Sequence, residues 1–193
     1  MKKKIKQSIF SNVKRRYQIG IMGSMADLRY SKRIESMAEA VGRAVAQNNC
    51  IMIYGAEKDS DSLSTAALRG AKQAGGLTVG VTYGKGKTIW DKKGDTDVII
   101  CSGLERGGGR EFVLVNSCDG IIAISGGSGT MNEMLVAYQL NIPIVVLKGT
   151  GGWADAVAGK YFDNRKRMKA VPARTATEAV AKIITLVKEY EQK

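Results

Sequence analysis

The sequence predicts an α/β fold of the Rossmann-like type, an open parallel sheet with helices on both faces. Two observations predict it. Short apolar segments alternate along the chain with segments whose apolar residues have helical spacing. The apolar segments are also near-continuous, which is typical of strands that are covered on both faces. The chain has 193 residues without a linker or an internal repeat, which favours one domain over two small ones.

The first predicted strand is YQIGIMGS, residues 17–24, which ends in a glycine turn. A helix is predicted over residues 31–49, because apolar residues recur there at steps of three and four, and Ser31 suits its N-cap. Residues 50–56 are apolar enough for a second strand. The next helix, residues 62–76, ends at two glycines, as helices commonly do.

The second half of the chain continues this alternation. Its predicted strands are apolar segments that each end at a glycine: residues 77–84, 97–103, 119–127 and 142–149. Its predicted helices have apolar residues on one face: residues 110–118, 130–141 and 175–192. Thr175 and Glu178 have the spacing of a capping box at the start of the last helix.

The loops after the strands are expected to form one rim, because ligands of open parallel sheets bind beyond the carboxyl ends of the strands. Five such loops carry glycines or charged residues. They read MGS, YGAEKDSD, CSGLERGGG, SGGSGT and KGTGGW in chain order. We therefore expect the functional site at this rim, with Gly23 and Ser24 close to the ligand because they end the first strand.

The net charge of +12 is concentrated at the N-terminus, since residues 1–16 contain seven of the 30 Lys and Arg residues and no acid. We interpret this segment as a flexible, solvated tail and residues 17–193 as a single Rossmann-like domain. A basic tail could bind nucleic acid, so a nucleic-acid-binding or regulatory protein is one alternative. No nucleic-acid-binding signature accompanies the tail, and we do not expect a nucleic-acid partner.

Several function classes are disfavoured by composition. The chain has no histidine, and Cys50, Cys101 and Cys118 are far apart, so we expect no metal site. Scattered cysteines in apolar surroundings indicate reduced, buried thiols in a cytoplasmic protein. No stretch approaches the roughly 18 apolar residues of a membrane span, and the basic N-terminus lacks the apolar core of an export signal. We expect no membrane partner.

The segment SGGSGTMNEM, residues 125–134, follows the apolar stretch GIIAI. Its glycines, which tolerate positive φ, are Gly126, Gly127 and Gly129. Its two hydroxyl groups belong to Ser128 and Thr130. Backbone N–H groups in such a turn, together with the positive end of the following helix, favour a phosphate. Thr130 and Glu133 also have the spacing of a capping box, so a purely structural turn is equally compatible with these residues.

The stretch GGREFVLVNSCDGIIAISGGSGTMNEMLVAYQLNIPIVVL resembles the LOG-like superfamily, once often labelled lysine-decarboxylase-like. The hallmark of that family is P-G-G-x-G-T-x-x-E, with an Arg near the start of the preceding helix. The positions that match it here are Gly126, Gly127, Gly129, Thr130, Glu133 and, for the Arg, Arg110. The likeness extends to GAKQAGGLTVGV, GTGGWADA and KYFDNR, and looks closest to the branch that contains the molybdenum cofactor carrier proteins.

The resemblance implies a binding protein or an enzyme. A carrier-type member would hold a phosphorylated small molecule, a nucleotide or a molybdenum-pterin cofactor, at the glycine turn, without turnover. A LOG-type enzyme would cleave the N-glycosidic bond of a nucleoside 5′-monophosphate such as a cytokinin ribotide, and would require no cofactor. Glu133 would then stabilise positive charge on the ribose or direct water to it, with Arg110 orienting that carboxylate and the substrate.

Other properties follow from the resemblance only. It implies a homo-oligomer, a dimer or larger. It gives no support to a lysine decarboxylase, because no lysine lies in an evident cofactor-aldimine motif. Trp153 could stack on a base or pterin at the rim, or serve as a packing or dimer contact.

Two segments depart from the family pattern. The loop YGAEKDSDSLS stands where the family often has a second glycine-rich turn, and it keeps only Gly55 while introducing three acids, Glu57, Asp59 and Asp61. We interpret it as a solvated loop in which Ser60 or Asp61 caps the next helix; contact with a sugar hydroxyl, a base or a cation is the alternative. Ser125 replaces the usual Pro, which we interpret as a mild change.

Overall fold

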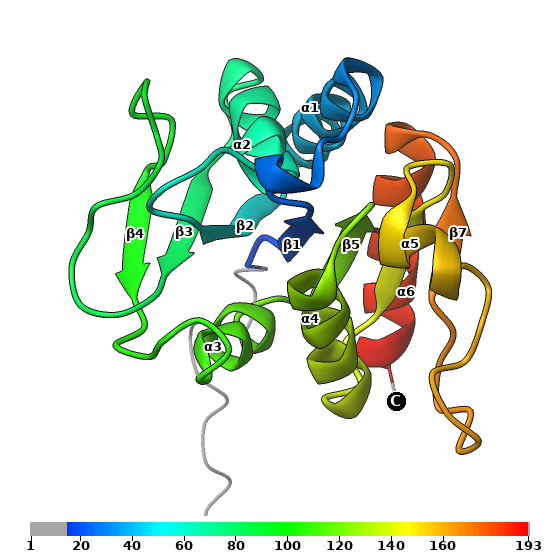
Figure 1. The fold of residues 1–193 in the computed structure, drawn as a ribbon. Helices are drawn as coiled ribbons and strands as arrows, with labels where there is room; N and C mark the ends of the chain where they lie inside the picture. Colours follow the sequence, from blue (N-terminus) through cyan, green and yellow to red (C-terminus); the bar gives the residue numbers. More distant parts are fainter. Residues whose placement is uncertain (1–14, 193) are drawn as a thin grey trace, which may run out of the picture.

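The computed structural model describes residues 15–192, so the predicted tail lies outside the described residues except for Arg15 and Arg16. Within residues 15–192, seven strands form one sheet in the order β4-β3-β2-β1-β5-β6-β7, and all neighbouring pairs are parallel (Figure 1). The strands are β1 (Gln18–Gly23), β2 (Ile51–Ala56), β3 (Thr78–Thr82), β4 (Val98–Cys101), β5 (Gly120–Ile124), β6 (Ile144–Leu147) and β7 (Val171–Ala173). The predicted α/β, Rossmann-like fold class is confirmed.

Helices cover both faces of the sheet, as predicted (Figure 1). One apolar core lies under α1 (Lys32–Gln47), α2 (Leu63–Gln73) and α6 (Ala176–Glu191). The other lies under α3 (Arg110–Asn116), α4 (Ser128–Gln139) and α5 (Gly152–Val157). A short 3-10 turn, η1 (Ala26–Leu28), follows β1. In the part of the chain described here, no helix is both long and apolar enough to cross a membrane.

The helix starts follow from local sequence. The side chain of Ser31 accepts a hydrogen bond from the N–H of Ile34 and caps α1, as predicted. The side chain of Thr175 accepts one from the N–H of Glu178 and caps α6. In a capping box, the side chain of Glu178 would accept a hydrogen bond from the N–H of Thr175. It accepts instead from the N–H of the preceding residue, Arg174, at 2.8 Å.

The structure also differs from the prediction in several places. β7 and α5 were not predicted, because both are short and interrupted by proline or glycine. β4 was expected to be covered on both faces, but it is the edge strand, with Val98 44% and Ile100 38% exposed. Cys101 on this strand is exposed, so the prediction of buried thiols is wrong for this cysteine.

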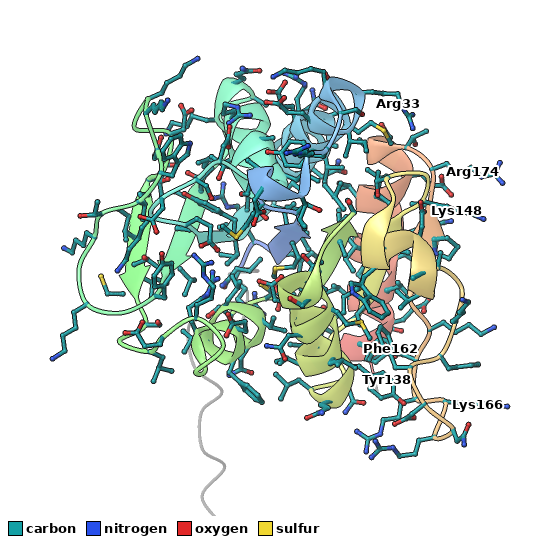
Figure 2. The ribbon with its side chains drawn as sticks, in the orientation of Figure 1. Arg33, Tyr138, Lys148, Phe162, Lys166 and Arg174 are labelled. Carbon is teal, nitrogen blue, oxygen red and sulfur yellow. The ribbon has the colours of Figure 1, made fainter. Side chains whose placement is uncertain are left out.

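The long connection before β7 is anchored on α4. Tyr138 of α4 and Phe162 contact each other with ring centroids 5.1 Å apart, and Figure 2 shows both at the lower end of α4. The hydroxyl of Tyr138 donates to Asp163. This KYFDNR segment therefore packs on the outer helix layer, and its residues do not line the cavity described below.

The sheet order places a crevice between β1 and β5. From β1 the chain adds β2, β3 and β4 on one side, then returns to place β5 on the other side. β1 and β5 end together, because Gly23 pairs with Ile124 in the parallel register. Ligands of open α/β sheets bind where the strand order reverses in this way, beyond the carboxyl ends of the strands.

Candidate functional site

A cavity of about 520 Å³ opens at this reversal point. Its walls come from the residues that follow β1, β2 and β5 and from the first turn of α3. All of the predicted site residues except Gly126 line it: Gly23, Ser24, Arg110, Gly127, Ser128, Gly129, Thr130 and Glu133. The structure thus brings together residues that are more than 100 positions apart in the sequence.

The glycine turn presents the N-terminus of α4 to the cavity. The N-cap residue is Gly127, which has no side chain to cap the helix. Within residues 15–192, the N–H groups of residues 127–130 donate no hydrogen bond. Free N–H groups at a helix N-terminus, combined with the helix dipole, suit an anion. The alternative interpretation of Thr130 and Glu133 as a capping box does not hold, because both residues lie inside the helix.

Gly126 shapes this turn without lining the cavity. Its N–H donates to the hydroxyl oxygen of Ser24 at 2.8 Å, so this amide is not available to a ligand. Its φ is +102°, and a Cβ at this position would lie 2.5 Å from the Cβ of Thr130. Gly126 is thus not part of the cavity wall, and its conformation explains why the position requires glycine.

Ser125 gives the turn a backbone that proline cannot adopt. Its φ is +55°, whereas the proline ring holds φ near −65°. Its N–H donates to the hydroxyl oxygen of Thr150 at 2.8 Å, and proline has no N–H. Ser125 is therefore not a mild replacement for the Pro of the motif, because proline fits neither this backbone conformation nor this hydrogen bond.

The GTGGW loop supports the turn without entering the cavity. The N–H of Trp153 donates to the carbonyl of Gly126 at 3.0 Å, and a Cβ on Gly152 would lie 2.5 Å from that same carbonyl oxygen. The indole of Trp153 is itself 41% exposed and is not part of the cavity wall. The structure gives no support to stacking of Trp153 on a ligand inside this cavity.

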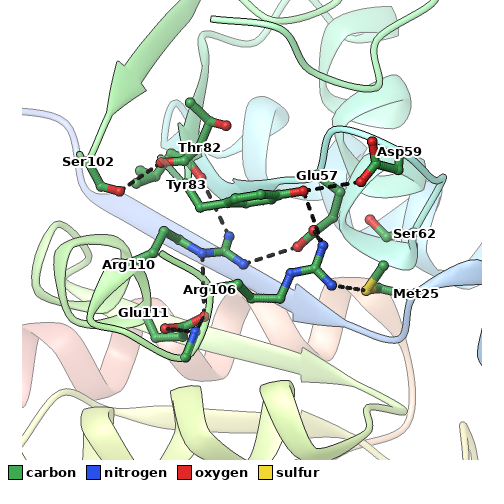
Figure 3. Close-up of polar contacts among 12 residues, drawn as sticks. Met25, Glu57, Asp59, Ser62, Thr82, Tyr83, Ser102, Arg106, Arg110 and Glu111 are labelled. Atoms are coloured by element: carbon green, nitrogen blue, oxygen red, sulfur yellow. Dashed lines mark hydrogen bonds and ion pairs between the residues drawn. The ribbon is translucent and has the colours of Figure 1, made fainter. Parts of the chain in front are cut away.

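Arg110 lies at the start of α3 and is only 3% exposed (Figure 3). Its Nη2 donates to Oε1 of Glu57 at 3.0 Å, while Arg106 donates to Oε2 of the same carboxylate at 2.7 Å. The resemblance implied that Arg110 orients Glu133. In this structure the ion-pair partners of Arg110 are instead Glu57 and Glu111.

Glu57 belongs to the site, although the sequence indicated it only as one of three acids in an atypical loop. It directly follows β2, is 7% exposed and lines the cavity, so the interpretation of its loop as solvated is wrong at this position. The cap of α2 is Ser62 rather than Ser60 or Asp61. The signal available in the sequence was the pair of arginines in RGGGR, which requires a buried anion if both face the rim.

Glu133 places an unpaired carboxyl group in the cavity. The group is 8% exposed, and no hydrogen-bond donor reaches it from any residue the structure describes. Burial raises its pKa to about 8; the charge of Arg110 opposes this rise, and Glu111 and Glu57 add to it. At pH 7 the group is therefore protonated, and in that form it can donate a hydrogen bond.

The comparisons with known proteins agree with this architecture. The model of the SLOG cluster4 family matches residues 16–180. The chain belongs to the SLOG cluster4 family. An uncharacterized protein from Archaeoglobus fulgidus is 29% identical over 131 residues, which covers 68% of this chain and 80% of that protein.

Solved structures similar to this SLOG cluster4 chain include two at 27% identity. The X-ray structure of TM1055 has a TM-score of 0.76 and covers 88% of this chain and 99% of its own. The molybdenum cofactor carrier protein MCP from Chlamydomonas reinhardtii has a TM-score of 0.73 over 90% of this chain and 99% of its own. The molybdenum cofactor binding protein from Rippkaea orientalis, at 23% identity and a TM-score of 0.73 over 90% of this chain and 98% of its own, shares the fold.

Proposed function

We propose that this protein binds a phosphorylated small molecule at the N-terminus of α4, as a carrier-type or binding-type member of its family. The observation that supports this most directly is the free N-terminus of α4 at the cavity wall. Residues 127–130 offer successive backbone N–H groups there, and Ser128 and Thr130 add hydroxyl groups. A phosphate group would satisfy several of these donors at once.

The ligand we propose is a nucleotide or a molybdenum-pterin cofactor. A cavity of about 520 Å³ suits a molecule of that size. The similarity to the carrier protein MCP supports the pterin, and the phosphate of either ligand fits the donors at the start of α4. Arg110, Glu57 and Glu133 would then contact the remainder of the ligand, because they line the same cavity.

The proposal is tested by identifying what the protein binds. Mass spectrometry of the small molecules released from the purified protein should detect a phosphorylated compound. Titration calorimetry with inorganic phosphate, AMP and a pterin monophosphate should then show binding by at least one of them. A protein that releases no phosphorylated compound and binds none of these three would overturn the proposal.

A phosphoribohydrolase is the second candidate, and Glu133 is the observation that favours it. A buried carboxyl group with a pKa near neutrality is typical of catalytic acids and bases. Incubation with AMP and other ribotides should release free base if the protein is such an enzyme, and Glu133→Gln should abolish the release. The hydrogen bond of Arg110 to Glu57 supports binding without turnover, because the resemblance assigns to Arg110 the orientation of Glu133 in an enzyme.

The proposal includes a homo-oligomer in the cytoplasm. Exposed apolar residues on edge strand β4, Val98 and Ile100, support an interface between copies. The three free cysteines are compatible with a reducing compartment. Binding of an oligonucleotide that depends on residues 1–16 and on salt concentration would instead support the nucleic-acid alternative.

A further inference from the structure

We propose that Glu57 is a specificity-determining residue, whose carboxylate accepts hydrogen bonds from two adjacent hydroxyl groups of a phosphorylated sugar, free or within a nucleotide. The inference rests on the proposed function, because the phosphate of the same ligand would bind at the start of α4. It gives the atypical loop after β2 a role in recognition of the end of the ligand away from the phosphate.

The position of Glu57 fits this role. Glu57 follows β2 and the glycine turn follows β5, with β1 between these two strands. Neighbouring strands lie about 4.8 Å apart, so the two walls of the cavity are separated by roughly 10 Å. A ligand whose phosphate occupies the N-terminus of α4 would therefore cross the end of β1 and reach Glu57 with its sugar.

The carboxylate of Glu57 is held as an acceptor. Arg110 donates to one oxygen at 3.0 Å and Arg106 to the other at 2.7 Å (Figure 3). An ionised carboxylate has about four acceptor positions, so one remains on each oxygen. Two adjacent hydroxyl groups on a sugar ring match two such positions side by side.

The charges around Glu57 disfavour a second phosphate at this end. The two guanidinium groups of Arg106 and Arg110 face two carboxylates, those of Glu57 and Glu111. Glu111 also accepts from the N–H of Gly107, at 3.1 and 3.2 Å to its two oxygens. The positive charges of the two arginines are thus neutralised by carboxylates of the protein itself. This wall therefore offers hydrogen-bond acceptors to a ligand and no net positive charge.

One polar group at the cavity wall accepts and donates no hydrogen bond within the described residues. It is the carboxyl group of Glu133, which lines the cavity and is 8% exposed. Nε of Arg110, by contrast, faces Oε1 of Glu111 at 3.6 Å and is occupied within the protein. Since buried polar groups are normally satisfied, Glu133 is available to complete hydrogen bonds with a molecule whose sugar reaches Glu57.

The chemistry of this position supports a sugar. A carboxylate that already accepts from two arginines can accept further hydrogen bonds from neutral hydroxyl groups, whereas a phosphate offers no donor to it. Glu57 is the first residue after β2 and lines the cavity. The loop after β2 therefore presents an acceptor that suits a sugar.

The test compares ligands that differ in their hydroxyl groups. Titration calorimetry on the full chain would use AMP, 2′,3′-dideoxy-AMP, ribose 5-phosphate and inorganic phosphate. We expect AMP to bind roughly ten- to hundred-fold more tightly than its dideoxy analogue, because two hydrogen bonds to a charged group are lost. If ribose 5-phosphate binds as tightly as AMP, the ligand is a sugar phosphate. If AMP binds more tightly than ribose 5-phosphate, the ligand is a nucleotide.

A pair of variants assigns the effect to Glu57. In Glu57→Gln the preference for AMP over the dideoxy analogue should fall to about one, while binding of inorganic phosphate is not weakened. Asp59→Asn removes an exposed carboxylate of the same loop and should keep the preference. Thermal unfolding would confirm that both variants fold. If Glu57→Gln does not fold, the affinities of the unaltered protein for AMP and its dideoxy analogue decide whether the sugar hydroxyl groups are recognised.

The outcomes separate this inference from the function on which it rests. Equal binding of AMP and its dideoxy analogue would overturn the role of Glu57 and leave phosphate binding at α4 intact. Weakening of all ligands alike in Glu57→Gln, inorganic phosphate included, would also overturn it. Failure of the protein to bind these four compounds and also a pterin monophosphate would overturn both proposals. Binding of the pterin monophosphate without binding of AMP or ribose 5-phosphate would overturn the role of Glu57 alone.

Discussion

Gly55 and Arg110 lie so close together that a Cβ at residue 55 would be 2.2 Å from Nη1 of Arg110. The guanidinium group therefore rests directly on the backbone of β2, and from there it reaches the carbonyl of Val81 at 3.5 Å and the carboxylate of Glu57. The one glycine that this loop retains thus makes room for an arginine. It does not serve as a phosphate-binding turn.

Gly55→Ala should displace the buried guanidinium group of Arg110. We expect the free energy of unfolding to fall by about 1–3 kcal/mol, as overpacking of a filled interior commonly does. Chemical denaturation would measure it. Gly129→Ala is the matched control, because a Cβ at that position meets nothing within 4 Å. A Gly55→Ala protein as stable as the unaltered one would contradict this account of the contact.

Gly129→Asp should weaken anion binding without unfolding the protein. The position is exposed in the first turn of α4, where a carboxylate is favourable to the helix but repels a phosphate at the same N–H groups. We expect phosphate affinity to fall roughly ten-fold or more. Gly129→Asn has the same shape without the charge and should retain most of the binding. If both variants bind equally well, the anion does not bind at the start of α4.

Binding of AMP should weaken as the pH rises through about 8. Burial raises the pKa of Glu133 to about 8, so its carboxyl group is protonated at pH 7 and becomes negative above pH 8. The new charge would lie in the second turn of α4, close to the bound phosphate. Calorimetry between pH 7 and pH 9 should record a loss of affinity of roughly ten-fold. The same titration on Glu133→Gln should be flat, and a parallel decline there would assign the effect to another group.

Glu133→Gln should also stabilise the protein. An acid whose pKa is raised in the folded state loses its proton first in the unfolded state, so stability declines from about pH 4.5 to about pH 8 and is constant above that range. The variant removes this decline, and we expect a gain on the order of 2 kcal/mol at pH 8. Denaturation curves at pH 5 and pH 8 would measure it. A variant equally destabilised at both values would contradict the burial of an uncompensated carboxyl group.

Ser125→Pro should be strongly destabilising although it restores the residue usual in the family motif. Proline cannot adopt the φ of +55° and removes the N–H that donates to Thr150. We expect a loss of about 3 kcal/mol or more. Ser125→Gly keeps the N–H and tolerates the backbone, so it should remain close to the unaltered protein in melting temperature. A stable proline variant would show that the turn can take the usual path of the family.

Much of the architecture could be predicted from local sequence. The six longest strands and the caps at Ser31 and Thr175 depend on apolar continuity and on the residue next to the helix, which a single sequence displays directly. β7 escaped prediction because a strand of three residues containing Pro172 has almost no local signal. The edge position of β4 depends on the order of strands in the sheet, and no residue of β4 records that order.

The glycine turn of the candidate site could be predicted from the sequence, but the ion pairs of the site could not. Gly127 and the start of α4 follow from the turn sequence. The contact between Glu57 and Arg110 joins residues 53 positions apart, and its geometry depends on how the start of α3 meets the loop after β2. Ser125 has a φ of +55° and donates its N–H to Thr150 on a neighbouring loop, and the motif alone reveals neither feature.

The two walls of the cavity are encoded in separate stretches of chain, one before and one after the return of the chain across β1. The earlier stretch supplies Glu57, and the later one supplies the helix end that suits an anion. Substitutions in the first stretch can therefore change which molecule binds, while the second stretch continues to bind the same anionic group. Such a division would let related proteins diverge in their choice of ligand by replacing one short loop.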